Sequence, residues 1–208
     1  MKILNQQVHD DLAAGKPLHL DLGSGGPGRD GCYGVDFFEL PGVAIQADLN
    51  APLSALPANS VGRVRSSHCL EHISQFMQLM DELHRIVRPD GSIEITVPHF
   101  SNPYGYSDPT HVRFFGLFSF NYFVETMKQP ARKVPNFYSD TRFDITRIEI
   151  SLMKRTWAHK LMYPRMRKEL NDSFENQERW ERSMCWSSPA NEISFTMRPV
   201  KGPLGAAR

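Results

Sequence analysis

A glycine-rich turn directly follows a short apolar run near the start of the chain. Residues 20–28 read LDLGSGGPG, which fits the pattern G-x-G-x-x-G after the apolar run Pro17–Leu22. Glycine adopts positive φ angles without strain and lets a ligand approach the backbone closely. A strand that ends in such a turn is typical of an open α/β sheet, in which ligands bind at the carboxyl ends of the strands.

Further apolar runs continue this pattern along the chain. Helices are predicted over Gln6–Ala14 and Phe76–Val87, because apolar residues recur there at helical spacing, and Arg88–Gly91 is predicted to form a turn. Together with Pro17–Leu22, strands are predicted at Cys32–Phe37, Val43–Asp48, Val61–Ser67, Ser92–Pro98, Phe143–Leu152 and Glu192–Arg198. The alternation predicts an α/β protein with a Rossmann-like, doubly wound, mostly parallel seven-stranded sheet and helices on both faces.

The second half of the chain has a different character. The aromatic run His111–Phe123 is predicted to turn helical near Ser119, and residues 156–186 are predicted to form one or two helices broken near Pro164. With 208 residues, the chain is expected to form one domain, 1–208, with a helical insertion at about 156–186 before the last strand.

Composition excludes several classes of protein. The formal net charge of +1 argues against a strongly basic nucleic-acid-binding protein, so no nucleic acid is expected as a partner. Cys32, Cys69 and Cys185 are scattered and form no C-x-x-C pair, which fits a reducing cytoplasm. The polar first residues exclude a signal peptide, and no apolar run is long enough to cross a bilayer. We therefore expect a soluble cytoplasmic protein.

Acidic residues stand at the ends of the first three predicted parallel strands. Asp21 lies two positions before the first glycine, where it would repel the pyrophosphate of a dinucleotide but attract the cationic sulfonium and ammonium groups of S-adenosylmethionine. Asp36 ends the second strand, where a carboxylate can accept hydrogen bonds from a ribose diol. Asp48 ends the third strand and is placed to accept from an adenine amino group.

These motifs resemble those of the class I S-adenosylmethionine-dependent methyltransferases, in particular small methyltransferase-domain proteins. The resemblance runs from about Leu18 to Phe100 and rests on LDLGSG, GVD, ADL, the SSHCLEHI segment, a helix followed by RPDG, and a strand ending in VPH. It implies that S-adenosylmethionine is the cofactor. The implied cofactor-binding residues are Asp21, Gly23, Ser24 and Gly25 for the methionine part, Asp36 for the ribose, Asp48 and Leu49 for the adenine, and Ser67 and His68 at the reacting end.

One departure from the family pattern concerns the first crossover. Only ten residues separate Asp21 from Cys32, which is too few for a full helix between the first two strands. A contribution of a helix amino terminus to cofactor binding is therefore not expected here.

The pentapeptide His68–His72 fits the zinc-protease pattern H-x-x-E-H. Such a site needs both histidines on one helix and a third ligand beyond it, whereas Val61–Ser67 is predicted as a strand that runs straight into His68. We interpret Glu71 and His72 as the start of the next helix and expect no metal ion.

The methyl acceptor is expected beside the ends of the fourth and fifth parallel strands. His99 follows the fifth strand, and resemblance to family members with a similar DPTHVRFF stretch implies that the 108–111 loop folds over the same crevice. His111 and His99 are therefore the predicted catalytic bases, ahead of His68. The alternative for each histidine is a buried, hydrogen-bonded ring. Methyl transfer is an in-line displacement, so alignment of the nucleophile with the sulfonium methyl is expected to supply most of the catalysis.

Two segments have both a functional and a structural interpretation. The aromatic residues between Phe114 and Phe123 would form a cover over the acceptor or, as we prefer, part of the core. Basic and aromatic residues between Lys154 and Lys168 would suit an anionic or membrane-bound acceptor, but acidic residues follow closely, so a solvated surface is preferred and at most peripheral membrane contact is expected.

The sequence thus predicts an S-adenosylmethionine-dependent methyltransferase that acts on oxygen or nitrogen of a small-molecule or glycan-type acceptor. A dinucleotide-dependent oxidoreductase and a non-catalytic S-adenosylmethionine-binding module remain as alternatives.

Overall fold

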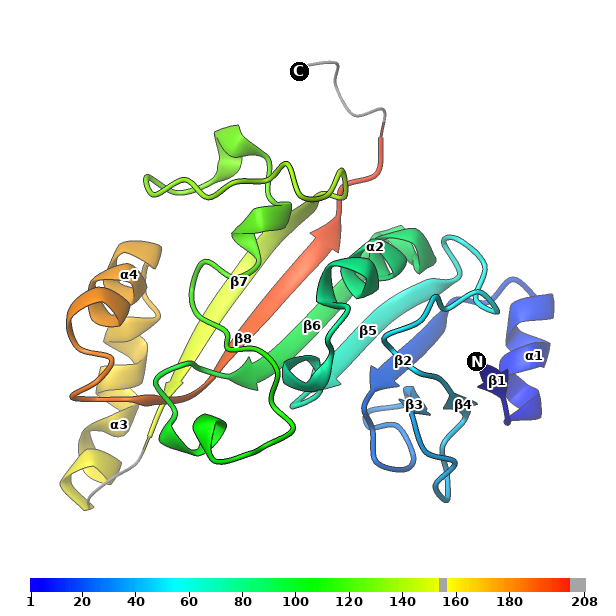
Figure 1. Cartoon of the computed structure of the whole chain (residues 1–208), viewed down its shortest axis with the longest axis horizontal. Coiled ribbons are helices and arrows are strands. Elements are labelled where there is room, and N and C mark those ends of the chain that lie inside the picture. Colours follow the sequence, from blue (N-terminus) through cyan, green and yellow to red (C-terminus); the bar gives the residue numbers. More distant parts are fainter. Residues whose placement is uncertain (154–156, 203–208) are drawn as a thin grey trace.

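The computed structural model of the chain describes residues 1–153 and 157–202, with side chains for all of these except 157–162. It contains one eight-stranded sheet with the strand order β1-β4-β3-β2-β5-β6-β8-β7 (Figure 1). The strands are β1 Lys2–Ile3, β2 Leu18–Leu22, β3 Tyr33–Asp36, β4 Ile45–Gln46, β5 Val61–Ser67, β6 Val87–Pro98, β7 Phe143–Leu152 and β8 Ala190–Pro199.

Strands β2 to β6 run parallel to one another, whereas β1, β7 and β8 pair antiparallel with their neighbours. The predicted Rossmann-like, mostly parallel sheet is confirmed, and β1 adds a two-residue edge strand to the seven predicted strands. The chain moves outward from β2 through β3 to β4 and then returns to β5 on the other side of β2. This reversal of direction places a ligand crevice at the carboxyl ends of β2 and β5.

The central strands are apolar because the sheet is covered around them. Leu18, Leu20 and Leu22 of β2 lie on one face of the sheet and are fully buried, whereas His19 on the other face is exposed and Asp21 is buried. In β6 the buried residues Ile93 and Ile95 alternate with more exposed ones, which follows the twofold period of a strand.

Two predicted helices are present where the periodicity placed them. Helix α1, Gln6–Ala13, begins at Asn5, whose side chain accepts a hydrogen bond from the Gln7 N–H, and it ends before Gly15, which has a φ of +66°. Helix α2, Phe76–Ile86, lies in front of β5 and β6 in Figure 1 and buries Leu79, Met80 and Leu83. The rest of the front of the sheet, over β6 to β8, is crossed by the segment that joins β6 to β7 (Figure 1).

The first crossover contains no helix in the fully described residues 23–32, in agreement with its predicted shortness. It is instead a compact turn held close to the sheet at Gly28. A Cβ atom at Gly28 would lie 2.1 Å from the carbonyl oxygen of Cys32 and 2.7 Å from the Gly34 nitrogen. The crossovers between β3 and β4 and between β4 and β5 also lack an α-helix, so the described helices cover the faces of the sheet more sparsely than predicted.

The predicted turn Arg88–Gly91 is wrong, because these residues lie inside β6. The register between β5 and β6 shifts there: Val61 faces Val87, but Arg63 already faces Ser92. The extra residues bulge out, and Arg88 forms an ion pair with Asp90 at 2.9 Å. Strand β6 thus begins directly after α2, with no separate turn between them.

The run His111–Phe123 turns helical close to Ser119, as predicted, but only as a short 3₁₀ turn, η3 Asn121–Phe123. Buried contacts determine this path. Phe115 bridges to His99 beside the sheet, and the ring of Phe76 packs edge-on against Phe115, Phe120 and Phe123 at 5.5–5.8 Å. These aromatic residues belong to the core, as the structural interpretation predicted.

The helices between β7 and β8 are α3, Trp157–Leu170, and α4, Phe174–Ser183. The predicted break near Pro164 is wrong, since α3 continues through this residue and the chain turns at residues 171–173 instead. There, the Asn171 side chain bonds both the N–H and the carbonyl of Ile150, and Ser173 begins α4. The side chains at Lys154, Arg155, Trp157, Lys160, Leu161 and Met162, part of the predicted basic and aromatic surface, lie outside the described residues.

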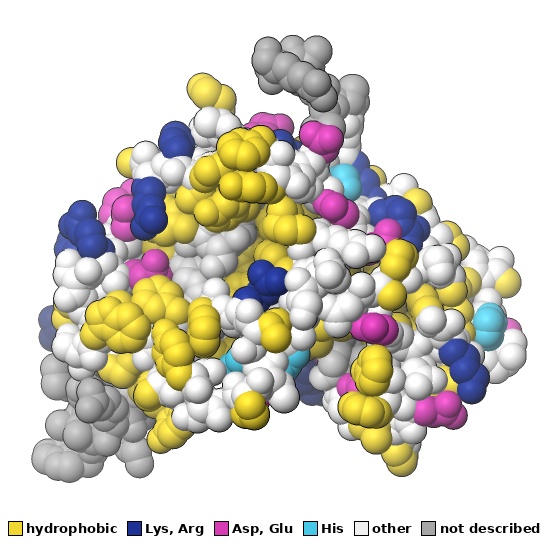
Figure 2. All heavy atoms as spheres, viewed as in Figure 1, with side chains coloured by type: hydrophobic (Ala, Val, Ile, Leu, Met, Phe, Trp, Pro, Cys, Tyr) yellow, Lys and Arg dark blue, Asp and Glu magenta, His cyan; other side chains and the backbone are white. Residues whose placement is uncertain are grey.

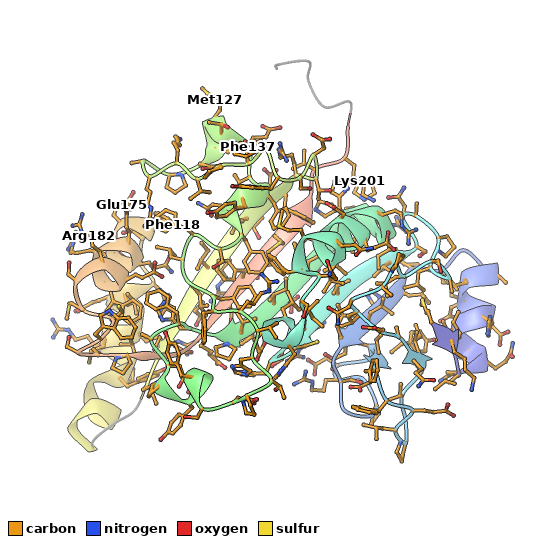
Figure 3. The ribbon with its side chains drawn as sticks, viewed as in Figure 1. Phe118, Met127, Phe137, Glu175, Arg182 and Lys201 are labelled. Atoms are coloured by element: carbon orange, nitrogen blue, oxygen red, sulfur yellow. The ribbon has the colours of Figure 1, made fainter. Side chains whose placement is uncertain are left out.

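No helix in the described part of the chain is long and apolar enough to cross a membrane. Two exposed apolar side chains, Met127 and Phe137, project from the segment that precedes β7 (Figure 3). The same segment is held to the fold by Gln129, whose side-chain amide donates to the carbonyls of Asn121, Val124 and Val134.

Candidate functional site

A cavity of about 340 Å³ opens at the carboxyl ends of β2, β3, β4 and β5, where the direction of the chain reverses. We call it the donor cavity. It combines two carboxylates with aromatic and aliphatic walls. Its lining residues are Gly23, Asp36, Phe37, Phe38, Ala47, Asp48, Leu49, Asn50, His68, Cys69, His72 and Ile73.

The glycine turn forms one wall of this cavity through Gly23. Gly23 and Gly25 have φ angles of +65° and +64°, which side chains rarely tolerate. Cys69, which follows the end of β5, packs against Gly23 so closely that a Cβ atom there would lie 2.6 Å from the Cys69 Sγ. The wall is therefore bare backbone, as predicted for a turn that a ligand approaches closely.

Ser24 does not face the cavity, although it was predicted to bind the cofactor. Its hydroxyl donates to the Gly26 carbonyl at 2.7 Å and thereby stabilises the turn itself. Ser67 is not part of the cavity wall either. It pairs with Thr96 of β6, and the chain bends toward the cavity only at the next residue, His68.

Asp36 ends β3 at the cavity, where the sequence placed it. One carboxylate oxygen accepts from the Gly25 N–H at 2.8 Å and the other accepts from the Phe38 N–H at 3.1 Å. These bonds fix the carboxylate beside the glycine turn and leave further lone pairs directed elsewhere. The chemistry fits a ligand that offers hydroxyl donors.

The end of β4 supplies the opposite wall. Asp48 accepts from the Asn50 N–H at 2.8 Å, and the Asn50 side-chain oxygen accepts from the Gln75 N–H at the start of α2. Leu49 is buried and lines the cavity, as predicted. An apolar slot edged by one carboxylate results, which suits a flat heteroaromatic ring with an amino group.

Asp21 differs from its predicted role. Its carboxylate is completely buried and receives three hydrogen bonds from Arg29, one from the backbone N–H at 3.1 Å and two from the guanidinium at 2.9 and 3.1 Å. Asp21 does not line the donor cavity. Because a guanidinium already neutralises it, its charge does not select between cationic and anionic ligands in this structure.

His68 occupies the corner where β5 ends. Its φ of +53° is unusual for a non-glycine residue and turns its side chain out of the strand direction. The ring Nε2 donates to Glu192 at 3.1 Å, and the Nδ1 lies 3.5 Å from Glu71. The hydrogen bond to Glu192, followed by the 3.5 Å contact with the Glu71 carboxylate, raises the pKa of His68 to about 9. A cationic imidazole cannot accept a proton near neutral pH, which agrees with its low rank as a base.

His99 is a buried structural residue, which corrects its predicted catalytic role. The Nδ1 accepts from the Ser101 backbone N–H at 3.1 Å and contacts the Ser101 hydroxyl at 2.8 Å, while Nε2 contacts Glu181 at 3.1 Å. Both ring nitrogens are thus engaged, and the side chain is fully enclosed. His99 does not line the donor cavity. It connects the end of β6 to Glu181, which also accepts a hydrogen bond from the Leu117 N–H.

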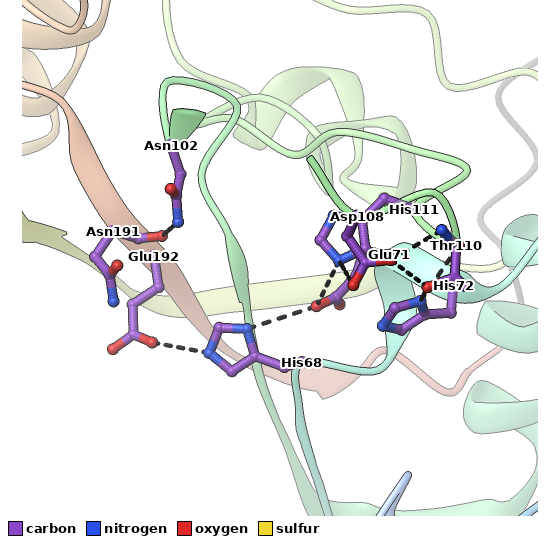
Figure 4. Close-up of polar contacts among 9 residues, drawn as sticks. All are labelled: His68, Glu71, His72, Asn102, Asp108, Thr110, His111, Asn191 and Glu192. Carbon is purple, nitrogen blue, oxygen red and sulfur yellow. Dashed lines mark hydrogen bonds and ion pairs between the residues drawn. The ribbon is translucent and has the colours of Figure 1, made fainter. Parts of the chain in front are cut away.

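His111, the other predicted base, lies close to Glu71 and His72 (Figure 4). Its Nε2 is 4.0 Å from Glu71 and 3.6 Å from Asp108. The 108–112 loop is fastened to the 3₁₀ turn η1, Leu70–His72, because the Val112 N–H donates to the Glu71 carbonyl at 2.9 Å. The loop therefore folds toward the donor cavity, as expected, and touches it through His72.

A second, larger cavity of about 1060 Å³ lies on the other side of the His68–Glu192 pair, with Glu192 in its wall. We call it the acceptor cavity. Aromatic and polar residues line it: Ser101, Pro103, Tyr104, Tyr106, Ser151, Leu152, Met153, Tyr163, Trp186, Pro189, Asn191 and Glu192. In Figure 2, histidine side chains are visible at the edge of the molecule where the parallel strands end.

Sequence analysis did not predict several residues that the fold brings to the site. Phe37 and Phe38 directly follow the predicted Asp36, so an exposed aromatic pair after a strand end was a usable signal. Glu71 was visible as the glutamate of H-x-x-E-H but was interpreted as the start of a helix, and Cys69 within the same segment carried no signal of its own. Glu192 gave no signal, because it meets His68 across 124 residues of sequence.

Comparison with known proteins agrees with this architecture. Residues 34–95 match the family model for a methyltransferase domain, whereas no curated protein matches the chain. The fold resembles that of an S-adenosylmethionine-dependent methyltransferase from Archaeoglobus fulgidus, with 18% identity, a TM-score of 0.54, and coverage of 93% of this chain and 91% of that one. It also resembles the YcgJ protein from Bacillus subtilis, with 12% identity, a TM-score of 0.52, and coverage of 95% and 99%.

The family match spans β3 to β6 and so includes most of the donor cavity wall. The structural likenesses establish the fold over nearly the whole chain. Residues 34–95 thus match a methyltransferase domain, and the chain has the fold of S-adenosylmethionine-dependent methyltransferases, which favours this class over the dinucleotide-dependent oxidoreductase.

Proposed function

We propose that this methyltransferase binds S-adenosylmethionine in the donor cavity and transfers its methyl group to oxygen or nitrogen of a small-molecule or glycan-type acceptor in the neighbouring cavity. The observation that carries the proposal is the bare backbone at Gly23 beside the fixed carboxylate of Asp36, both at the strand ends where the chain reverses.

The residues present fit the cofactor part by part. Asp36 has acceptor capacity left for the two ribose hydroxyls after it has bonded two backbone N–H groups. Leu49 and Ile73 offer apolar surfaces for the adenine ring, and Asp48 offers an acceptor for its amino group. The methionine part would then run along Gly23 toward His68, and Gly25 contributes by holding Asp36 in place.

The main contribution of this protein to methyl transfer would be to align the acceptor with the methyl group of the donor. An acceptor lone pair attacks the methyl carbon as the carbon–sulfur bond breaks, and sulfur leaves with the bonding electrons as S-adenosylhomocysteine. His68 lines the donor cavity and its partner Glu192 lines the acceptor cavity, so the pair restricts the direction from which an acceptor approaches the methyl group. Of the two predicted bases, we retain His111 for the proton of the acceptor when no metal ion is bound, because both ring nitrogens of His99 are engaged.

The wall of the acceptor cavity supports a small polar acceptor. Tyr104, Tyr106 and Trp186 are all more than half exposed and combine flat faces with polar groups, while Asn191 and Glu192 add hydrogen-bonding groups. Pockets of this kind bind small molecules by apolar contact and orient them through a few polar groups. We propose no nucleic acid as partner and at most peripheral membrane contact.

We further propose that residues 1–208 work as one domain with α3 and α4 as its insertion. A cytoplasmic location is supported by three free, buried cysteine thiols.

Two measurements test the proposal. S-adenosylmethionine and S-adenosylhomocysteine should raise the thermal midpoint of the purified protein, whereas NAD⁺ at the same concentration should not, because only a ligand that binds the folded state stabilises it. A panel of hydroxylated and aminated small molecules and oligosaccharides, screened for release of S-adenosylhomocysteine, then identifies the acceptor. Stabilisation by NAD⁺ alone would contradict the donor assignment, and turnover of nucleic acid only would contradict the acceptor class.

A further inference from the structure

The side chains of Glu71, His72 and His111 converge beside the donor cavity (Figure 4). One ligand atom from each lies within 4.8 Å of the other two. We propose that these three residues form a binding site for a divalent transition-metal ion. The site stands on its own geometry, whereas its use in methyl transfer rests on the function proposed above.

Glu71 provides the first argument. Its side chain is only 2% exposed, yet neither carboxylate oxygen has a hydrogen-bond partner among the described residues. Its Oε1 lies 3.5 Å from His68 Nδ1 and 4.0 Å from His111 Nε2, without the geometry of a hydrogen bond. A buried carboxylate that accepts no hydrogen bond is stabilised by a cation close to it, so this position favours a metal ion.

The hydrogen bonds of His72 provide the second argument. Its Nδ1 lies 2.9 Å from the Thr110 hydroxyl and 3.3 Å from the Thr110 carbonyl. The Thr110 hydroxyl in turn donates to Asp108 at 2.6 Å, so it accepts from His72. The proton therefore sits on Nδ1, and Nε2 keeps its lone pair. In metal sites, too, the ring nitrogen of a histidine that does not bind the metal usually donates its N–H to an oxygen.

The loop that carries His111 is fixed rather than loosely placed. Asp108 accepts from the Thr110 N–H at 2.9 Å, and the Val112 N–H donates to the Glu71 carbonyl. Arg113 then donates to the carbonyls of Ile73 and Ser74 and lies over the Phe76 ring at 4.9 Å. The loop thus holds His111, the third ligand, next to Glu71 and His72 before any ion binds.

Charge and ligand type define the ion. His68 lies between Glu71 and Glu192, and Asp108 places a third carboxylate beside His111. Two imidazoles and one carboxylate suit Zn²⁺, Fe²⁺, Co²⁺ or Mn²⁺ and disfavour Mg²⁺ and Ca²⁺, which prefer oxygen ligands. Three protein ligands leave coordination positions open. Modest side-chain rotation would bring the ligand atoms to the roughly 3.4 Å separation that metal–ligand bonds of about 2.1 Å require.

This set differs from the zinc pattern rejected from sequence. His68, the first histidine of H-x-x-E-H, is hydrogen-bonded to Glu192 and is not a ligand. His111, from a distant loop, supplies the third ligand. Because His72 also lines the donor cavity, an ion here would lie next to the donor and would orient an acceptor oxygen or nitrogen. His111 would then act as a ligand and not as the base.

Cobalt(II) titration of the tag-free, chelator-treated full chain tests the site directly. The visible absorption of cobalt and inductively coupled plasma mass spectrometry should report one ion per chain. His72→Ala, at a partly exposed position, and Glu71→Gln, which keeps the volume of the buried side chain, should each weaken binding by at least about tenfold. His9→Ala on α1 is the matched control and should bind as the wild type does. His68→Gln should remain within about threefold of the wild type, because His68 is not a ligand.

Calorimetric titration of S-adenosylmethionine in the same samples separates the two claims. No cobalt bound by the wild type, or equal binding by folded His72→Ala and Glu71→Gln proteins, overturns the metal site and leaves the donor assignment intact. Loss of cobalt binding in His68→Gln alone overturns the proposed ligand set. Stoichiometric cobalt together with no measurable S-adenosylmethionine binding retains the metal site and overturns the proposed function.

Discussion

The side chain of Cys69 rests against the α-carbon of Gly23, so that a Cβ atom at Gly23 would lie 2.6 Å from both Cβ and Sγ of Cys69. This contact joins the turn after β2 to the end of β5 and forms part of the donor cavity wall. Both the positive φ of Gly23 and the lack of space require glycine at this position.

Gly23→Ala should destabilise the protein by about 1–3 kcal/mol, because an overpacked core must shift. It should also weaken S-adenosylmethionine by more than about tenfold, since the added Cβ would displace Cys69, which lines the cavity. Urea unfolding and calorimetry measure the two effects. Gly15→Ala is the control, because Gly15 has a φ of +66° but nothing within 4 Å of an added Cβ. Equal effects of both substitutions would show that backbone strain alone matters.

Asp36→Ala should weaken S-adenosylmethionine by about 1.5–3 kcal/mol, the range for hydrogen bonds to a charged group, and should leave the fold intact. Calorimetry gives the affinity and circular dichroism the fold. Glu39→Gln is the control, since Glu39 lies on the same loop but its carboxylate pairs with Lys2, away from the donor cavity. Unchanged affinity in folded Asp36→Ala protein would contradict the ribose assignment.

Arg29→Met should lower the free energy of unfolding by about 2 kcal/mol or more, because it leaves the buried Asp21 carboxylate with only the Arg29 backbone N–H. Adding Asp21→Asn should recover part of the loss, since the uncompensated charge is then removed. A double-mutant cycle from urea unfolding measures this coupling. Strictly additive losses would show that the ion pair does not stabilise the fold.

All three cysteines should resist thiol reagents in the native protein at pH 8. Burial raises the pKa of Cys69 to about 12, and burial also raises the pKa of Cys32 and Cys185 above the ordinary value. Because the thiolate is the reactive form, a pKa above the working pH leaves little of it. Ellman's reagent should therefore react slowly before unfolding and should report three thiols in guanidinium chloride. Rapid reaction of one native thiol would contradict the prediction.

Much of the sheet followed from local pattern. Each short apolar run between turn residues became a strand, and β7 matches its predicted bounds, Phe143–Leu152. The positions of Asp36, Asp48 and Leu49 followed too, because residues at the ends of parallel strands meet at one edge whatever the loops do.

The argument from Asp21 reached the correct class of protein for a reason that the structure does not support. A carboxylate two residues before the glycine turn was expected to face a cationic donor, yet Arg29 neutralises it. Arg29 stands eight positions away in an irregular turn, and no periodicity predicts where such a side chain points. Strand order and the family match carry the assignment instead.

The sequence by itself determined the positions of the strands along the chain, the glycine turn and the acidic strand ends, since each depends on neighbours within a few residues. Tertiary structure alone decided which side chains meet at the site. His72 reaches Thr110 across 38 residues, and His68 reaches Glu192 across 124. It also decided that His99 is enclosed while His111 faces Glu71, because burial depends on how distant segments pack and not on the residues that flank each histidine.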